Sequence, residues 1–404
     1  MYKSIKTYFK LKILAQKLKK SNKHIDFLDD LKYERNVLIV DIKLPEYNKD
    51  SGSRRLTEII KILIDNKIGV FLLPDFKEYK FKYDYVQYFR DLGVIVYEPS
   101  LDNSGNFISK KQFLKIVLPK VNYAWLHRPE IFAKYYEVVK KDNPNVKVFF
   151  DMVDFHYLRF KRESELTGNP NIMKTVNKFL KLELDNCHKA DKIIVISDFE
   201  KESLKDYFPN QEKTISVGNI HQFIKDSHFK SFQERKDLLF IGGFDHKPNV
   251  DAVKYLHAEI MPMLWQTNPE ITINIIGSNV PVDIEAFHSD KFKILGYVDD
   301  VSTYFQESRV FVAPLRYGAG IKGKIGQSLE YGLPLVTTKI GAEGFDFNEN
   351  SGLVVADSKE EIVANILKIY QNETIWNKIS SDSKNVIAPF SLNAIQEKIK
   401  SLFV

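Results

Sequence analysis

Short apolar runs alternate with longer amphipathic segments along most of the chain. The segments between the runs place apolar residues three and four positions apart, which is typical of helices packed on one face. Strands that alternate with helices predict an α/β fold with mostly parallel sheets covered on both faces. The runs expected to form buried strands lie within 36–45, 69–74, 94–99, 123–129, 146–155, 192–197, 215–220, 237–244, 271–278, 292–298, 310–315, 333–338 and 352–357.

A polar stretch at 221–236 separates two series of these units and predicts a linker. A chain of 404 residues exceeds one comfortable core and favours two domains. We expect Rossmann-like domains at 36–222 and 236–385. A segment at 1–35 precedes them, and a helix at 386–404 is expected to pack back near the first domain. Parallel sheets bind ligands beyond the carboxyl ends of their strands, so the cleft between the domains is the expected site.

The stretch 311–344 is the most informative part of the sequence. A buried strand ends in a glycine loop, and a helix from about 322 to 331 follows before Gly332 and Pro334 stop it. A helix N-terminus with nearby cations suits a phosphate, although a solvated lysine face and an ordinary turn fit the same pattern. Glu330 lies about two turns further on, where its carboxylate would accept hydrogen bonds from sugar hydroxyls. The other candidates here are Arg316, Gly318, Gly320, Ile321, Lys322 and Lys324.

Three further loops of the second half follow the same scheme. Each comes directly after an expected strand and contains glycine, which lets a ligand approach the backbone. If these strands are parallel neighbours, the loops converge with the loop after Arg316 on one edge of the sheet. The candidate ligand-binding residues in them are Gly242, Gly243, His246, Gly277, Ser278, Gly296 and Tyr297.

In the first half, polar side chains gather after the strand expected within 146–155. Asp151 closes that strand, and Asp154 and His156 follow it, which predicts active-site residues at this edge of the sheet. The alternative is a salt-bridged helix face. His127 and Arg128 end another strand in the same way, although a single histidine is more often structural.

The first half also contains a small-residue loop before a helix. Gly52 lies there between two serines, in a loop that is expected to run to Arg55. This loop either admits a ligand to the backbone or forms an ordinary capped turn, since the full GxGxxG motif is lacking.

Composition narrows the classes of protein. Apolar residues make up 44% and charged residues 28% of the chain, as in soluble globular proteins. The single Cys187 excludes an internal disulfide, and neither it nor the histidines show metal-ligand spacing. No run long enough to span a membrane and no signal peptide is visible, so we expect a cytoplasmic protein.

The charge of +6 is concentrated at the start of the chain. Residues 1–24 hold eight lysines and no acid, interleaved with aromatic and aliphatic residues. Such a basic amphipathic segment is typical of a helix lying on an anionic membrane surface; the alternative is a solvated helix that packs its apolar stripe on the protein itself. The rest of the chain has no basic stripe, so nucleic acid is not an expected partner.

Several of these motifs together resemble a known family. FIGGFDHKPNVDAV, ILGYVDD and APLRYGAGIKGKIGQSLEYGLPLVTT in the second half, with NKDSGSRR and FFDMVDFHYLRFKRESELTG in the first, are similar to GT-B glycosyltransferases of family 4. The resemblance covers roughly 36–385 and lies closest to a bacterial subgroup that acts in polysaccharide assembly. It implies two Rossmann-like domains facing across a cleft, with a nucleotide-diphosphate sugar as the donor substrate and no cofactor.

The resemblance also implies roles for individual residues. Glu330 matches the family acid that holds the nucleotide ribose, and Lys322 stands where a second family acid contacts the donor sugar. Lys322 or Lys324 would face the diphosphate, with Lys324 and Arg316 in place of other family cations. Asp151 replaces the family's active-site histidine, with His156 close by. The loops at 277 and at 296–297 would hold the base.

The implied reaction is metal-independent transfer of a hexosyl group with retention of configuration. The departing diphosphate would assist a same-face attack by the acceptor, and the acceptor would be a glycan or a lipid-linked glycan bound on the side of the first domain. Two alternatives remain: a nucleotide-sugar epimerase of the same fold, and a catalytically inactive nucleotide-sugar-binding or scaffold subunit.

Overall fold

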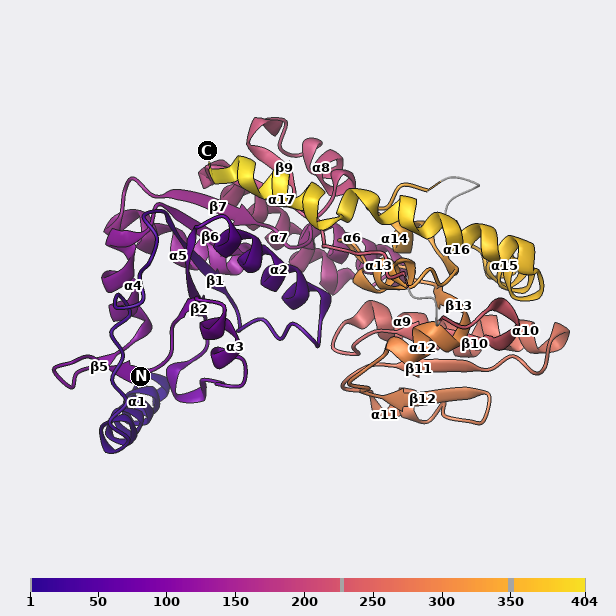
Figure 1. Ribbon diagram of the computed structural model, residues 1–404, viewed down its shortest axis with the longest axis horizontal. Coiled ribbons are helices and arrows are strands. Elements are labelled where there is room, and N and C mark those ends of the chain that lie inside the picture. Colours follow the sequence, from indigo (N-terminus) through magenta and orange to yellow (C-terminus); the bar gives the residue numbers. More distant parts are fainter. Residues whose placement is uncertain (1, 226–228, 348–351, 404) are drawn as a thin grey trace.

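The computed structural model describes residues 2–225, 229–347 and 352–403. Two α/β domains lie side by side, one formed by the first half of the chain and one by the second (Figure 1). Residues 226–228 of the expected linker lie outside the described residues. The remaining part of that linker contains one short 3-10 turn, Phe232–Glu234, and its last residue, Lys236, begins the first strand of the second sheet.

The N-terminal domain contains a seven-stranded sheet in the order β3-β2-β1-β6-β7-β8-β9, and all its strand pairs are parallel. Its central strands are buried along their whole length because helices cover both faces. The strands are β1 (Asn36–Asp41), β2 (Gly69–Pro74), β3 (Ile95–Val96), β6 (Tyr123–His127), β7 (Lys147–Asp151), β8 (Lys192–Val195) and β9 (Thr214–Ser216); β4 (Ser100–Leu101) and β5 (Phe107–Ile108) form a separate antiparallel pair. The helices are α1 (Tyr2–Lys20), α2 (Ser51–Asp65), α3 (Val86–Asp91), α4 (Lys110–Val117), α5 (Pro129–Asp142), α6 (His156–Thr167), α7 (Pro170–Lys189) and α8 (Asp198–Lys205).

The C-terminal domain contains a six-stranded parallel sheet in the order β12-β11-β10-β13-β14-β15. The strands are β10 (Lys236–Ile241), β11 (Ile273–Ile276), β12 (Phe292–Gly296), β13 (Ser308–Ala313), β14 (Leu335–Thr337) and β15 (Leu353–Val355). The helices are α9 (Lys247–Tyr255), α10 (Met261–Thr267), α11 (Val282–Glu285), α12 (Ser302–Glu307), α13 (Gly323–Glu330), α14 (Lys339–Ala342), α15 (Lys359–Gln371), α16 (Glu373–Ile387) and α17 (Leu392–Lys400). The expected α/β class with two parallel sheets is therefore confirmed.

Some local expectations were wrong. The strand expected at 94–99 keeps only two residues in the sheet, β3, because it is the edge strand and the chain then turns into the β4–β5 pair. Helix α2 begins at Ser51 rather than after Arg55, since the Asp50 carboxylate accepts the Ser53 N–H and caps the helix there.

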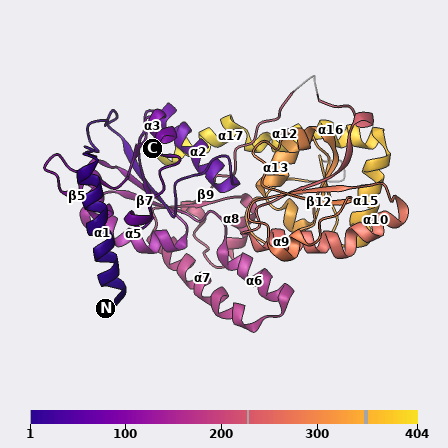
Figure 2. The ribbon, with the colours of Figure 1, turned by 90° about the horizontal axis from the view of Figure 1, so that it is seen from below.

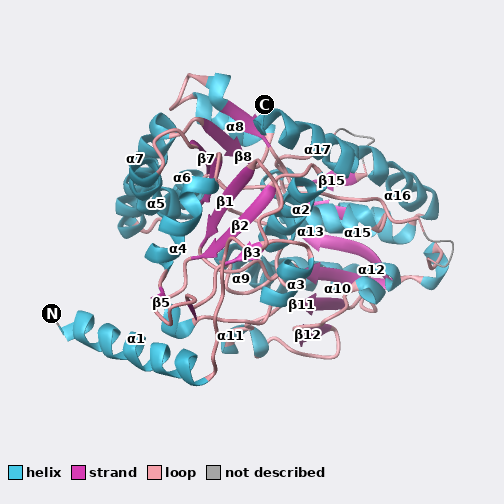
Figure 3. Ribbon diagram, turned by 60° about the vertical axis from the view of Figure 1, so that its left-hand side comes forward, coloured by secondary structure: helices cyan, strands magenta, loops and turns pink. Residues whose placement is uncertain are grey.

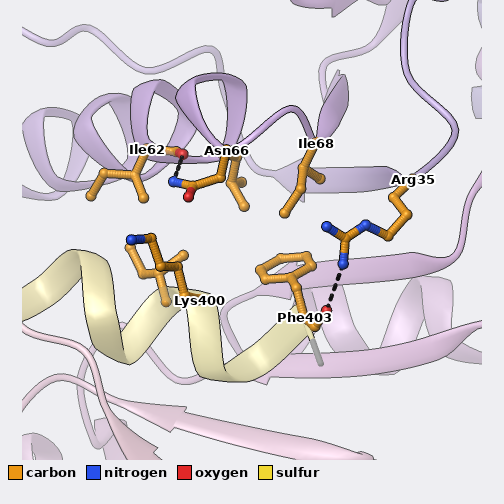
Figure 4. A pocket seen from close by; sticks show the side chains of 8 residues that line it. Arg35, Ile62, Asn66, Ile68, Lys400 and Phe403 are labelled. Atoms are coloured by element: carbon orange, nitrogen blue, oxygen red, sulfur yellow. Dashed lines mark hydrogen bonds between the residues drawn. The ribbon is translucent and has the colours of Figure 1, made fainter.

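The last helices return to the first domain. Helices α15 and α16 cover the C-terminal sheet, and α17 continues across to the N-terminal domain (Figure 1). Ile395, Ile399, Leu402 and Phe403 are buried in the N-terminal core, where Arg35 donates a hydrogen bond to the Phe403 carbonyl at 3.0 Å (Figure 4). A cavity of about 300 Å³ lies beside this contact, and the residues that line it are not among the predicted site residues.

Candidate active site

The glycine loops of the C-terminal domain meet at one edge of its sheet. Strands β12, β11, β10 and β13 are consecutive parallel neighbours, so the loops after Gly242, Gly277, Gly296 and Arg316 leave the same edge, as the sequence predicted. The approach is very close: a Cβ on Gly277 would lie 2.1 Å from the Gly242 carbonyl oxygen. Only glycine fits at this point.

Two helix N-termini from different domains face each other across the cleft. A Cβ on Gly323, the first residue of α13, would lie 2.4 Å from Cβ of Ser51, the first residue of α2. Gly52 follows in the same turn of α2. Both positive dipole ends therefore converge here, and the Asp50 carboxylate already caps that of α2.

Lys324, the second residue of α13, places its ammonium beside the end of β10 and the start of α9. Its Nζ lies 2.5 Å from Asn249 Oδ1 and 4.3 Å from the centre of the Phe240 ring, and a Cβ on Gly242 would fall 2.5 Å from it. Burial, together with the charge of Lys322, lowers the pKa of Lys324 to about 7. Within the described residues no carboxylate pairs with this ammonium, whose hydrogen-bond partner is the Asn249 side chain.

Lys322 has a different role from Lys324. It is the N-cap residue of α13, and its Nζ donates to the Gly320 carbonyl at 2.6 Å. It also lies 3.6 Å from Glu343, whose carboxylate accepts two hydrogen bonds from Arg162 of the other domain at 2.8 and 2.6 Å. The Lys322 ammonium therefore already has partners within the protein. Of the two lysines that could bind the diphosphate, the geometry favours Lys324.

Glu330 is engaged by protein groups. Its two oxygens accept from Arg54 of the N-terminal domain at 2.9 and 3.2 Å, and Oε1 also lies 2.9 Å from His221 Nδ1. Burial alone would raise the pKa of this carboxyl, but the His221 hydrogen bond and the Arg54 charge hold it below its usual value. Its ribose contact stays a prediction, and in this conformation it requires Arg54 to move. Gln327, one turn closer to the start of α13, is less buried.

Asp151 was expected to be catalytic, and the structure places it in a buried ion pair, so its catalytic role stays a prediction. The side chain is fully buried, and Oδ2 accepts from Arg55 and from Trp125 Nε1 at 2.9 Å each, while Oδ1 accepts the Val153 N–H at 3.0 Å. Burial opposes ionisation, but Arg55 and His127 keep the pKa of Asp151 below its usual value. Asp151 therefore serves as a structural ion-pair partner.

Asp154 borders the glycine loop of the other domain, and His156 packs behind it against Glu183 and Phe179. A Cβ on Gly320 would lie 3.1 Å from the Asp154 Cβ, so this aspartate borders the glycine loop. Burial would raise the pKa of Asp154, but Arg159 at 2.6 Å and His156 Nδ1 at 3.1 Å lower it to about 2. Burial would lower the pKa of His156, but the negative charge of Asp154 raises it. Glu183 accepts the His156 N–H and fixes the start of α6.

The structure makes His127 a stronger candidate for a ligand contact than the sequence did. It ends β6 beside Asp151 and is buried, and its Nε2 has no hydrogen-bond partner among the described residues. The next residue, Arg128, has φ +69°, and Val153 has φ +65°, which is costly for side chains other than glycine. An unpartnered ring nitrogen between two strained positions is typical of a ligand-binding edge.

Three other predicted residues are exposed, and one is buried. Arg316 pairs with Asp251 and lies over the Tyr255 ring, so its expected contact with phosphate would require it to leave a partner. Tyr297 and His246 are exposed at the rim. Ile321 is packed in the interdomain core. The remaining predicted positions are glycine or serine in the loops described above: Gly243, Ser278 and Gly318.

Sequence reasoning missed several residues of the cleft. These are Arg54, Arg162, Glu200, His221 and Glu343, which come from separate elements. Arg54, Arg162 and Glu343 lie within stretches that the sequence analysis quotes, but their partners come from other elements and only the folded chain brings them together. Within the described residues no group of three or more His, Cys, Asp or Glu side chains is placed to hold a metal ion.

Comparison with known proteins agrees with this architecture. Residues 235–372 match the family described as Glycosyl transferases group 1. A protein from Klebsiella pneumoniae, described as an uncharacterized 44.6 kDa protein in the cps region, is 21% identical over 319 residues, which cover 76% of this chain and 70% of that protein. The C-terminal domain is thus of the glycosyltransferase group 1 type.

Solved structures extend the similarity to nearly the whole chain. Sucrose-phosphate synthase from Thermosynechococcus elongatus superposes with a TM-score of 0.67 at 12% identity, over 91% of this chain and 98% of that chain. Anabaena HepE in complex with UDP-glucose gives 0.67 at 11% identity, over 91% and 99%. S. aureus TarM in complex with UDP, α-GlcNAc-glycerol and Fondaparinux gives 0.66 at 12% identity, over 91% and 99%. The fold is GT-B, as the resemblance implied.

Proposed function

We propose that this protein transfers a sugar from a nucleotide-diphosphate sugar to a glycan or lipid-linked acceptor in the synthesis of cell-surface polysaccharide. The group 1 match of the C-terminal domain supports a glycosyltransferase. The nucleotide-bound structures of HepE and TarM support a nucleotide donor, and the cps-region relative supports the polysaccharide context.

The observation that carries the proposal is the Lys324 ammonium, which lies beside the glycine loop after β10 and has no carboxylate partner among the described residues. A diphosphate bound here would meet this cation and the first N–H groups of α13. Charge that develops on the departing diphosphate would be stabilised by the same groups, which would lower the barrier. No metal takes part in this scheme.

We infer retention of configuration from the resemblance to family 4. Because no enzymic nucleophile is suitably placed among the described residues, retention would require attack on the same face of the sugar rather than a covalent intermediate. Asp151 is held by Arg55, and Asp154 is held by Arg159. The acceptor hydroxyl oxygen would bond to the sugar's anomeric carbon on the face from which the phosphate leaves. As the bond from that carbon to the phosphate oxygen breaks, the hydroxyl proton would pass to the phosphate. His127 would contact the donor sugar through its free Nε2.

Helix α1 supports a position at the inner face of the membrane. Leu18 is buried and Leu11 and Leu14 partly so, which corresponds to the packed alternative, but Tyr8, Phe9 and Ile13 are 63%, 57% and 53% exposed. The N-terminal end of α1 projects from the domain (Figures 2 and 3). Exposed aromatic and aliphatic side chains among lysines fit an anionic lipid surface.

None of the described helices is both long and apolar enough to cross a membrane. Changing Tyr8, Phe9 and Ile13 together to serine should lower sedimentation with vesicles that contain anionic lipid. Val282→Ser, at an 81% exposed position of the other domain, is the matched control. Equal sedimentation of the triple variant and the control would contradict membrane attachment.

The donor site is tested by thermal shift with UDP, GDP, dTDP, CMP and ADP. A ligand that binds only the folded state raises the melting temperature, so one nucleotide should stabilise the wild type and fail with Lys324→Ala. Release of that nucleotide from its sugar conjugate in the presence of acceptor then tests transfer. A chain that binds no nucleotide would contradict the proposal.

The buried, paired state of Asp151 favours one competing function, a catalytically inactive nucleotide-sugar-binding subunit. Nucleotide binding without turnover of any sugar conjugate would support that role. Conversion of the donor sugar without an acceptor would instead indicate the epimerase alternative. Transfer to an added glycan would exclude both.

A further inference from the structure

A carboxyl group of the N-terminal domain holds the glycine loop of the C-terminal domain. Glu200 lies in the first turn of α8 and is 1% exposed. Its Oε1 accepts the N–H of Phe155 at 3.1 Å in its own domain and the N–H of Gly320 at 2.7 Å across the cleft. One oxygen atom thus ties the loop that follows β7 to the loop that precedes α13.

The second oxygen of the Glu200 carboxyl, Oε2, is buried and forms no hydrogen bond with the described residues. An ionised carboxylate would leave charge unsolvated at this oxygen, whereas the neutral acid carries its proton there and keeps Oε1 as the acceptor. In agreement, burial, with Asp154 adding to it, raises the pKa of Glu200 to about 7.

Two charged groups face Glu200, one that opposes its ionisation and one that favours it. Asp154 faces it from the loop after β7, and Lys322 faces it from the start of α13. The charge of Lys322 is shared with Glu343, 3.6 Å away, and Glu343 is paired with Arg162 from α6. A negative Glu200 would therefore be repelled by Asp154 and would find a cation that already has a partner.

We propose that Glu200 is a positioning residue for the donor loop: in its neutral form it fastens residues 318–322 to the N-terminal domain, and on ionisation it releases them. The proton leaves to solvent in that step. The consequence for catalysis rests on the proposed function, in which this loop binds the donor, but the clamp between the domains does not.

Glu200→Gln tests the clamp through activity, because the amide keeps the acceptor oxygen and cannot ionise. Between pH 7 and 8.5 the neutral fraction of an acid with a pKa of about 7 falls roughly 15-fold. The KM for the donor should rise by about that factor more in the wild type than in Glu200→Gln, with little change in kcat. Glu200→Ala, which leaves two N–H groups without an acceptor, should raise this KM about tenfold even at pH 6.5.

Small-angle X-ray scattering of the nucleotide-free chain tests the clamp without any activity. The wild type should expand between pH 6 and 8.5, Glu200→Gln should stay compact, and Glu200→Ala should be expanded at both values. Glu202→Gln, on the same helix but with a 68% exposed side chain, should behave as the wild type.

Equal expansion of the wild type and Glu200→Gln would overturn the proposal, as would a compact Glu200→Ala. Loss of donor binding in Glu200→Gln at every pH would also overturn it, because the charged form would then be the working one. The expected scattering response in a chain without transferase activity would support the clamp and contradict the proposed function alone.

Discussion

Replacing Lys324 by methionine should stabilise the free protein and weaken its binding of nucleotide. The folded-state pKa of about 7 lies below the value of 10.5 for a free lysine, so the unfolded chain binds more protons between these values. The burial of this lysine therefore lowers the free energy of unfolding. This penalty is complete below pH 7 and disappears as the pH rises to 10.5. At pH 7 it amounts to about 4 kcal/mol at most.

Part of that gain is lost with the contacts of the ammonium. Asn249 Oδ1 loses its donor, which costs about 1 kcal/mol, and the contact with the Phe240 ring is worth about as much again. Lys324→Met should then be more stable than the wild type by about 2 kcal/mol at pH 7, and by much less near pH 10. Chemical denaturation at both pH values measures this difference.

The same variant should bind the nucleotide more weakly, because hydrogen bonds to charged groups contribute about 1.5–3 kcal/mol. The affinity should fall roughly 10- to 150-fold by titration calorimetry. Lys254→Met, which removes an exposed lysine paired with Asp283, is the control and should change neither quantity appreciably. A Lys324→Met protein that is less stable than the wild type, or that binds nucleotide equally well, would refute the reasoning.

Three further outcomes follow from the site. Nucleotide binding should take up a proton at Lys324 and weaken as the pH rises above about 7, which calorimetry in buffers of different ionisation enthalpy detects; binding independent of pH from 6.5 to 8.5 would contradict it. If ribose displaces Arg54 from Glu330, Arg54→Ala should tighten binding of a nucleoside diphosphate but not of pyrophosphate, whereas an equal effect on both would remove Glu330 from the ribose site. Asp151→Asn should destabilise the protein by about 3–5 kcal/mol, because Arg55 would stay buried without a counter-charge; a melting temperature like that of the wild type would show that the pair is dispensable.

The sequence by itself determined the class of fold and the edge of the sheet at which the glycine loops gather. Apolar runs that alternate with amphipathic segments leave a parallel α/β arrangement as the simplest way to bury both, and strand ends such as Gly242 and Gly277 then fall on one side. The glycine loop and Lys324 could be identified because they are neighbours along the chain. Local patterns carry local information of this kind.

The tertiary structure decided which polar residues are enclosed within one domain and which lie at the contact between the two domains. Asp151 and Asp154 look equivalent in sequence, yet Arg55 from α2 and Trp125 from β6 enclose the first, while the second borders the cleft. The clamp at Glu200 joins positions that are 120 residues apart. Burial and charge pairing depend on which elements meet across the two domains, and no pattern within a single segment encodes that meeting.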